Sequence, residues 1–158
     1  MSLLPVTPDV LEAALALNNA HAIELSPLDA GALARLIDQA FHARRVGAVD
    51  GLLIAFDQRA DYDSPNFLWF RARHPRFVYV DRVVIAPAAR GRGLARMLYA
   101  DLMARAVAAG HDRIVCEVNV EPPNATSDAF HTALGFVEVG RARIERYGKT
   151  VRYLMRTL

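Results

Sequence analysis

The chain has 158 residues, of which 53% are hydrophobic and 23% charged, and its formal net charge is +2. This length suits one domain over residues 1–158, which would bury roughly 70% of the unfolded surface. No apolar run reaches the ~20 residues that cross a bilayer, and the first residues lack the pattern of a signal peptide. We therefore expect a cytoplasmic protein with no membrane partner. The scattered basic residues predict no nucleic-acid partner either.

The first third of the chain reads as two helices and a hairpin. One short helix is predicted over 8–17, and a second begins at Ser26-Pro27 and keeps helical spacing to about Arg44. The polar residues between the two helices are interpreted as capping and solvated groups; they are Asn18, Asn19, His21 and Glu24. Strands over 46–49 and 52–56 then flank Asp50-Gly51, a strong hairpin signal.

A polar stretch over 57–70 ends in an aromatic cluster that is too irregular for a strand. Loops of this length are often functional. Carboxylates beside aromatic faces suit an amine through charge and cation–π attraction. Alternatively, the aromatic residues fill the core and the aspartates are solvated. On the first interpretation the predicted acceptor-binding residues are Tyr62, Asn66, Trp69 and Phe70, with Asn119 added from a later strand.

A strand buried on both faces is predicted over 77–85, and Pro87 ends it. A helix follows over 94–109 and stops at Gly110. The segment between them, Arg90-Gly91-Arg92-Gly93, has small residues and positive charge just before the helix. Free N–H groups at a helix start attract phosphate, so this segment predicts an anion site. The alternative is a tight turn with solvated arginines.

The last third predicts a strand over 111–120, a helix over 125–134 and two strands over 137–144 and 150–158. Strand alternation places Glu117 and Asn119 on one face and Cys116 on the other. A lone cysteine cannot form an internal disulfide, and Cys116 is interpreted as an inert core thiol. The fold class predicted is α/β (α+β), with a mixed, largely antiparallel sheet of about six or seven strands and about four helices.

Two motifs resemble the GNAT superfamily of acyl-coenzyme A-dependent N-acyltransferases. Arg90, Gly93 and Ala95 match the family's pyrophosphate loop. Asn124, then His131 and Gly135-Phe136, match a later motif, so the resemblance covers about 77–136. The amino-acid sequences of several short segments also resemble those of a bacterial group of predicted acetyltransferases. The resemblance does not name the substrate of that group. A dinucleotide fold is disfavoured, because Arg96 occupies the position of the third glycine in G-x-G-x-x-G.

The resemblance implies a GNAT-like sheet whose central pair of strands splays apart, and a bound acetyl-coenzyme A without a metal. Backbone groups of the 83–85 strand would pair with the pantetheine arm, and one N–H would face the thioester oxygen. The coenzyme-binding residues that we assign are Val83, Val84, Ile85, Arg90, Gly91, Arg92, Gly93, Leu94, Ala95, Asn124, Ser127 and Phe130.

Acyl transfer to an amine needs a base for the amine and an acid for the departing thiolate. Glu117 is the preferred base and Asp81 the second choice, although Asp81 could instead form an ion pair with Arg82. His131 stands where the family usually has the tyrosine that protonates the thiolate, so it is the predicted acid, unless it is only a packed side chain.

The predicted function is acetyl transfer from acetyl-coenzyme A to a primary amine by direct attack in a ternary complex. The acceptor is a small-molecule or peptide amine. The alternative is an idle acyl-coenzyme A sensor, which would need the Arg90 loop but neither Glu117 nor His131. The sequence also leaves a homodimer open.

Overall fold

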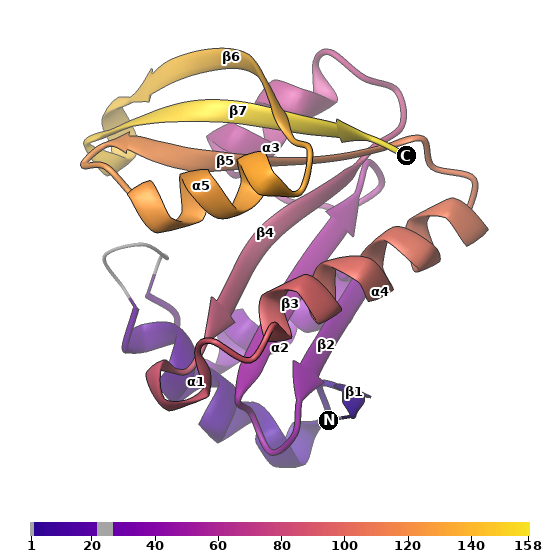
Figure 1. Ribbon diagram of the computed structural model, residues 1–158, viewed down its shortest axis with the longest axis vertical. Helices are drawn as coiled ribbons and strands as arrows, with labels where there is room; N and C mark the ends of the chain where they lie inside the picture. The colour runs from indigo at the N-terminus through magenta and orange to yellow at the C-terminus, as the bar shows by residue number, and fades with distance from the viewer. Residues whose placement is uncertain (1, 22–26) are drawn as a thin grey trace.

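The computed structural model describes residues 2–21 and 27–158. Within these residues, seven strands form one sheet in the order β1-β2-β3-β4-β5-β7-β6 (Figure 1). The strands are β1 (Leu3–Pro5), β2 (His42–Val46), β3 (Gly51–Asp57), β4 (Val78–Ile85), β5 (Arg113–Glu121), β6 (Val137–Ile144) and β7 (Lys149–Thr157). The α-helices are α1 (Leu11–Asn19), α2 (Ala30–Gln39), α3 (Pro65–Arg71), α4 (Leu94–Ala108) and α5 (Ala125–Ala133), and short 3₁₀ turns lie at Pro8–Val10, Pro87–Ala89 and Glu145–Tyr147.

The sheet is mixed, and its central pair separates. All neighbouring strands are antiparallel except β4 and β5, which are parallel and pair only at Val78–Ile114 and Tyr79–Val115. Beyond this short ladder the two strands diverge, as Figure 1 shows. The predicted fold class and the splayed central pair are therefore confirmed. The gap between β4 and β5 leaves backbone groups of both strands open to a ligand.

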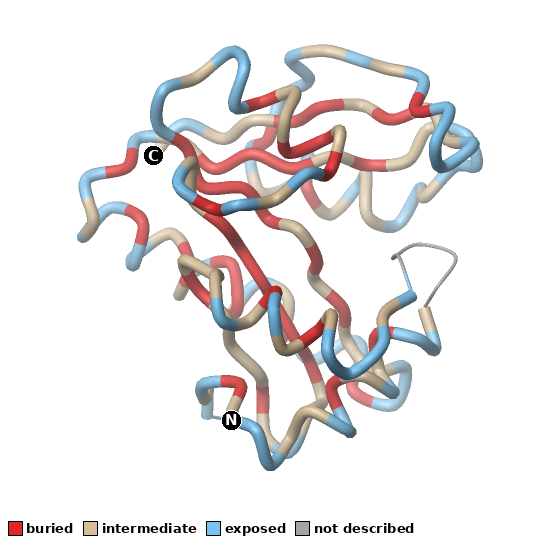
Figure 2. Tube along the Cα trace, turned by 180° about the vertical axis from the view of Figure 1, so that it is seen from behind, coloured by how far each residue is buried: buried red, intermediate tan, exposed pale blue. Residues whose placement is uncertain are grey.

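Helices cover both faces of the sheet and bury two cores. Residues of α1, α2 and α3 pack on one face around Phe56, Phe67 and Tyr79. Residues of α4 pack on the other face around Leu98 and Tyr99, with Phe136 and the side of α5. The buried residues run along the strands and the inner sides of the helices (Figure 2).

A bulge in β4 changes which residues share a face. Ile54 pairs with Arg82 and the next residue, Ala55, pairs with Val80, so Asp81 is the extra residue. Strict alternation would send Asp81 and Arg82 to opposite faces, but a bulge removes that constraint. The two side chains form an ion pair, with Arg82 Nε 2.7 Å from Asp81 Oδ2.

Two predicted boundaries in the first third were wrong. The second helix was expected to reach Arg44, but α2 ends at Gln39 and His42–Val46 forms β2. Helical spacing continues through Ala40 and Phe41, so periodicity alone could not show that pairing with β3 competes and wins. The same helix was expected to begin at Ser26-Pro27, but Asp29 caps α2, which begins at Ala30. Ser26 itself, like Glu24, lies outside the described residues.

The hairpin turn was also misplaced. Residues 47–50 make the turn, closed by Asp50 N–H donating to Val46 O at 2.8 Å, and Gly51 already pairs with Val46 in the ladder. A Cβ on Gly51 would lie 2.8 Å from Ile85 Cδ1, so this glycine serves close packing rather than the turn.

The stretch after β3 is more ordered than expected, because Pro65 begins α3. Proline at the first helical position after serine is a helix-start signal that the aromatic irregularity obscured. Within α3, Phe67 and Phe70 are fully buried, and Trp69 stacks on Tyr153 with ring centroids 4.1 Å apart.

Gly140 in β6 packs directly against the ring of Trp69. A Cβ at this position would lie 2.5 Å from Trp69 Cζ2, and the indole is held between Tyr153 and Arg73. Gly140→Ala is therefore expected to lower the free energy of unfolding by about 1–3 kcal/mol, the usual cost of overpacking. Urea denaturation measures this, and an unchanged midpoint would show that Trp69 moves aside freely.

Candidate active site

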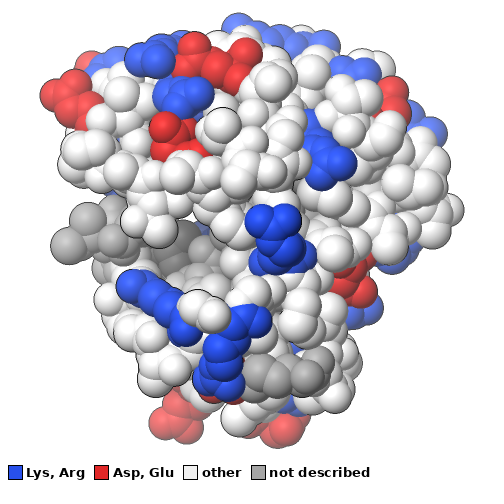
Figure 3. Space-filling view, viewed as in Figure 1, with Lys and Arg blue, Asp and Glu red and all other residues white. Residues whose placement is uncertain are grey.

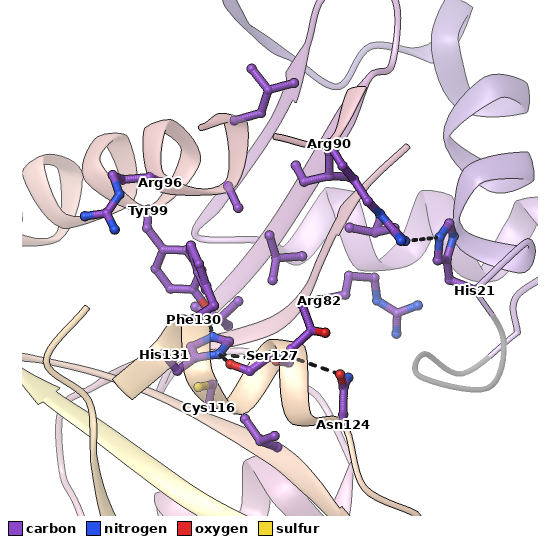
Figure 4. A pocket seen from close by; sticks show the side chains of 18 of the residues that line it. His21, Arg82, Arg90, Arg96, Tyr99, Cys116, Asn124, Ser127, Phe130 and His131 are labelled. Atoms are coloured by element: carbon purple, nitrogen blue, oxygen red, sulfur yellow. Dashed lines mark hydrogen bonds between the residues drawn. The ribbon is translucent and has the colours of Figure 1, made fainter. Parts of the chain in front are cut away.

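A large cavity of about 650 Å³ opens between the diverging strands. It is bounded by β4, β5, the start of α4 and α5 (Figure 4). The predicted coenzyme-binding residues that line it are Val83, Val84, Ile85, Arg90, Gly91, Gly93, Leu94, Ala95, Asn124, Ser127 and Phe130. Arg92 is exposed and stands outside this lining. Basic side chains gather around the hollow on this face (Figure 3).

The start of α4 gives one end of this cavity an anion-binding character. Gly93 precedes the helix with φ 72° and no side-chain cap, so the first N–H groups of α4 lie beyond a glycine turn. Gly91 has φ 80°, and no atom lies within 4 Å of the Cβ position of either glycine. Such a helix start with Arg90 and Arg96 beside it fits a phosphate group.

His21 is a lining residue that sequence analysis did not assign to the site. Its Nδ1 lies 3.0 Å from Leu17 O, which can only accept, so Nδ1 carries the proton. Its Nε2 then accepts a hydrogen bond from Arg90 at 3.2 Å (Figure 4). The end of α1 thereby reaches the loop before α4.

A second, smaller cavity of about 60 Å³ adjoins the first. It is lined by Tyr62, Ser64, Asn66, Tyr79, Tyr147, Lys149 and Val151, together with four residues that also line the large cavity. The four shared residues are Asp81, Arg82, Glu117 and Asn119. Segments far apart in the sequence therefore meet at one junction between the two cavities.

Glu117 lies at this junction with its carboxylate held by three hydrogen bonds. The Tyr79 hydroxyl is 2.9 and 2.7 Å from its two oxygens, and Asn66 Nδ2 donates to Oε1 at 3.1 Å. The Tyr153 hydroxyl donates to Asn66 Oδ1 at 2.9 Å, which turns the amide nitrogen toward Glu117.

Withdrawal from water raises the pKa of Glu117 to about 7. The hydrogen bond from Tyr79 opposes this rise, the charge of Asp81 adds to it, and the bond from Asn66 opposes it. A carboxylate with a pKa near neutrality can accept a proton and release it again, which is what a general base requires.

Asp81, the second choice as base, is already engaged. Its Oδ1 accepts from the Tyr62 hydroxyl at 2.6 Å and its Oδ2 accepts from Arg82 at 2.7 Å. Arg82 also donates to Asn18 Oδ1 at 2.7 Å, and Asn18 is fully buried. The interpretation of Asn18 as a solvated group was wrong, because it supports this buried network.

His131 is buried and has both ring nitrogens occupied. Its Nδ1 lies 2.7 Å from Ser127 O, an acceptor, so Nδ1 carries the proton and Nε2 accepts from the Tyr99 hydroxyl at 2.6 Å (Figure 4). Burial lowers the pKa of His131, so the ring is neutral near neutral pH. Edge-on contacts with Tyr99, Phe130 and Phe136 fix its plane.

The structure does not bring Trp69 and Phe70 to either cavity. Phe70 is fully buried, and the two faces of Trp69 are covered by Arg73 and Tyr153. Neither ring presents a face to a ligand, so this geometry supports their packing interpretation and the acceptor site proposed below omits them. Tyr62, Asn66 and Asn119 do line the small cavity.

Several site residues were missed by sequence analysis because tertiary contacts alone reveal them. Tyr79 and Tyr153 read as ordinary strand aromatics, yet their hydroxyls support Glu117. Tyr99 lies in the helix predicted over 94–109 and was not assigned to the site, yet it bonds to His131. Ser64 lies in the polar stretch over 57–70, and no local signal places it in the small cavity.

Residues 2–21 and 27–158 contain neither a cluster of metal ligands nor a membrane-spanning helix. No group of three His, Cys, Asp or Glu side chains lies close enough to hold a metal ion there. No helix in this part of the chain combines the length and apolar character needed to span a bilayer.

Comparisons with known proteins identify the family. No curated protein matches the sequence. Among solved structures, a ribosomal-protein-alanine N-acetyltransferase from Brucella melitensis is 21% identical, with all of both chains covered and a TM-score of 0.72. Naa20 from Chaetomium thermophilum, in complex with a bisubstrate analogue, is 18% identical over 100% of this chain and 87% of that one, with a TM-score of 0.77. A Salmonella typhimurium protein solved with acetyl-CoA is 20% identical over 100% and 94%, with a TM-score of 0.70.

At these identities the structural matches show a shared fold. The family model of the acetyltransferase (GNAT) family matches residues 46–136. That segment holds β4, the loop before α4, the start of α4, β5 and α5, which together bound the large cavity. The chain therefore belongs to the acetyltransferase (GNAT) family.

Proposed function

We propose that the protein transfers an acetyl group from acetyl-coenzyme A to a primary amine by direct attack in a ternary complex. The observation that carries this proposal is the meeting of two cavities at Glu117. One has the size and basic end suited to a phosphorylated donor, and the other is small and polar. Donor and acceptor can then be bound at once, with the base between them.

The donor occupies the large cavity. Its pyrophosphate accepts hydrogen bonds from the N–H groups at the start of α4, beyond Gly91 and Gly93. The pantetheine arm follows the open edge of β4 at Val83–Ile85, where β4 has left β5. A backbone N–H of this edge donates to the thioester oxygen and stabilises the negative charge that develops there.

Acetyl transfer then proceeds by direct attack of the amine on the thioester. The amine nitrogen attacks the thioester carbon, the C–N bond forms and Glu117 takes the amine proton. The C–S bond breaks and its electron pair stays on sulfur. We assign the return of a proton to this sulfur to the Tyr99–His131 pair, whose acidic hydrogen lies on the Tyr99 hydroxyl. After the thiol leaves, the proton that Glu117 took from the amine returns through water to the Tyr99 hydroxyl, so both groups regain their starting states.

A thiol-release assay with acetyl-coenzyme A and a panel of amines tests the proposal. The expected result is amine-dependent release together with an acetylated product identified by mass spectrometry. Donor binding without release, with every amine tried, would instead support the alternative of an acyl-coenzyme A sensor. A rise in melting temperature on adding the donor shows binding in either case.

Tyr99→Phe and His131→Phe are expected to lower kcat by similar factors, on the order of 10-fold, because each removes one member of the same proton route. The double variant should be little worse than either single variant, since interacting residues are not additive. Single-turnover rates at saturating donor measure this. Effects that multiply in the double variant would show that the two residues act separately.

A further inference from the structure

The small cavity contains two polar side chains that the protein leaves without partners. The Asn119 amide and the Ser64 hydroxyl both line it, and neither makes a side-chain hydrogen bond to any described residue. The other polar groups of its buried wall are engaged with one another, as the pairs Tyr62–Asp81 and Asn66–Glu117 show. Tyr147, which is more exposed, also lines the cavity. Besides Tyr147, a ligand in this cavity meets Asn119 and Ser64 as unused donors and acceptors.

The size of the cavity limits what can enter. About 60 Å³ holds roughly four to six non-hydrogen atoms, given that a water needs at least 10–15 Å³ of such volume. Its lining is polar except for Val151 and the tyrosine rings, and the aromatic residues of α3 are turned into the core. A bulky apolar group next to the acceptor's amine would occupy this polar cavity, and the Asn119 amide would then have no hydrogen-bond partner on the ligand.

We propose that the acceptor is an α-amino carbonyl compound with a small or absent side chain, recognised through Asn119 and Ser64. This inference rests on the proposed acetyl transfer and names its substrate class. With the amine at Glu117, the carbonyl two bonds away accepts from the Asn119 amide, and the Ser64 hydroxyl binds the next polar atom. An amine on a plain alkyl chain, such as a lysine side chain, offers neither contact.

This chemistry occurs in a free amino acid amide and at the N-terminus of a polypeptide. The test compares glycinamide with n-butylamine, which is of similar size and imitates the end of a lysine side chain. Rates are expressed per unprotonated amine, because the two differ in basicity. We expect kcat/KM for glycinamide to exceed that for n-butylamine by at least ~10-fold, and phenylalaninamide to fall below glycinamide. A tripeptide that begins with glycine distinguishes the two sources. It should be a better acceptor than glycinamide if the substrate is a polypeptide N-terminus, and a poorer one if the substrate is a free amino acid amide.

Asn119→Leu supplies the decisive variant, because it keeps the approximate shape and removes the amide. The ratio of kcat/KM for glycinamide over n-butylamine should fall about 10-fold, and Ser64→Ala should lower it about 3-fold. Asn119 also lines the donor cavity, so the KM for acetyl-coenzyme A is measured alongside. A parent enzyme that prefers n-butylamine, or variants in which the ratio does not change, would overturn the inference. Release with no amine at all would contradict the proposed function instead.

Discussion

Glu117→Gln is expected to lower kcat by about 10²–10⁴, the contribution usual for general acid–base catalysis. Glutamine keeps the shape of the side chain and can still accept from Tyr79 and Asn66, which hold Glu117 at the cavity junction. Donor affinity should be unchanged, because the proposed phosphate site is formed by the start of α4 and not by Glu117. Steady-state kinetics together with a thermal-shift titration of the donor separate these two effects.

The pH dependence of kcat/KM tests whether Glu117 acts as the base. Glu117 acts as a base only when ionised, and its pKa is about 7, so parent kcat/KM should fall as pH drops through that value. The Glu117→Gln variant should lack this fall in its pH–rate profile. Its defect should therefore be largest above pH 7, where the parent carboxylate is ionised, and should shrink as pH falls through 7. A defect that stays constant from pH 6 to ~10 would make Glu117 a structural carboxylate.

The same substitution should raise stability while it lowers activity. The pKa of Glu117 is raised from 4.5 to about 7, so the folded protein binds more protons than the unfolded chain between these values. Stability from this group is present below pH 4.5 and is lost as pH rises through 7, at a cost on the order of 3 kcal/mol. Glu117→Gln removes that cost, so its melting temperature should exceed the parent's at pH 8, with the difference shrinking toward pH 5.

Gly93→Val is expected to weaken binding of acetyl-coenzyme A by at least ~100-fold. Gly93 has φ 72°, a conformation that costs a β-branched residue of order 1–3 kcal/mol, and its backbone borders the proposed pyrophosphate site. The added side chain would also stand where the phosphate approaches. Isothermal titration calorimetry with the donor measures the loss.

Gly148→Val is the matched control for backbone strain. Gly148 has φ 60° in the turn before β7, no atom lies within 4 Å of its Cβ position, and it lines neither cavity. The Gly148→Val variant should lose about as much stability as Gly93→Val and should bind acetyl-coenzyme A as tightly as the parent. Equal donor binding by Gly93→Val and the parent would show that the loop before α4 does not hold the donor.

Hydrophobic periodicity predicted the strands of the sheet, and the family resemblance carried by two motifs over 77–136 implied its central gap. Strand alternation correctly separated Glu117 from Cys116, which lies in the opposite core. Local patterns failed where long-range pairing decides, as at His42–Val46, and where one residue is inserted into a strand, as at Asp81.

The candidate site was predictable only where backbone chemistry defines it. Glycines and arginines before a helix are typical of a phosphate-binding turn, so donor residues could be proposed from the sequence. The partners of Glu117 and His131 could not, because Tyr153 contacts Asn66 and Tyr99 contacts His131 across large sequence separations. The aromatic stretch of α3 was misleading for the same reason, since Phe70 is core by tertiary packing alone.

The central claim is that donor and acceptor meet in one ternary complex, and bisubstrate initial-rate kinetics test it most directly. With acetyl-coenzyme A varied at several fixed amine concentrations, double-reciprocal plots should intersect. The intact mass of the protein incubated with donor alone should stay unchanged, because burial raises the pKa of the Cys116 thiol and keeps it unreactive. Parallel lines together with an acetylated protein would show a covalent intermediate and contradict direct transfer.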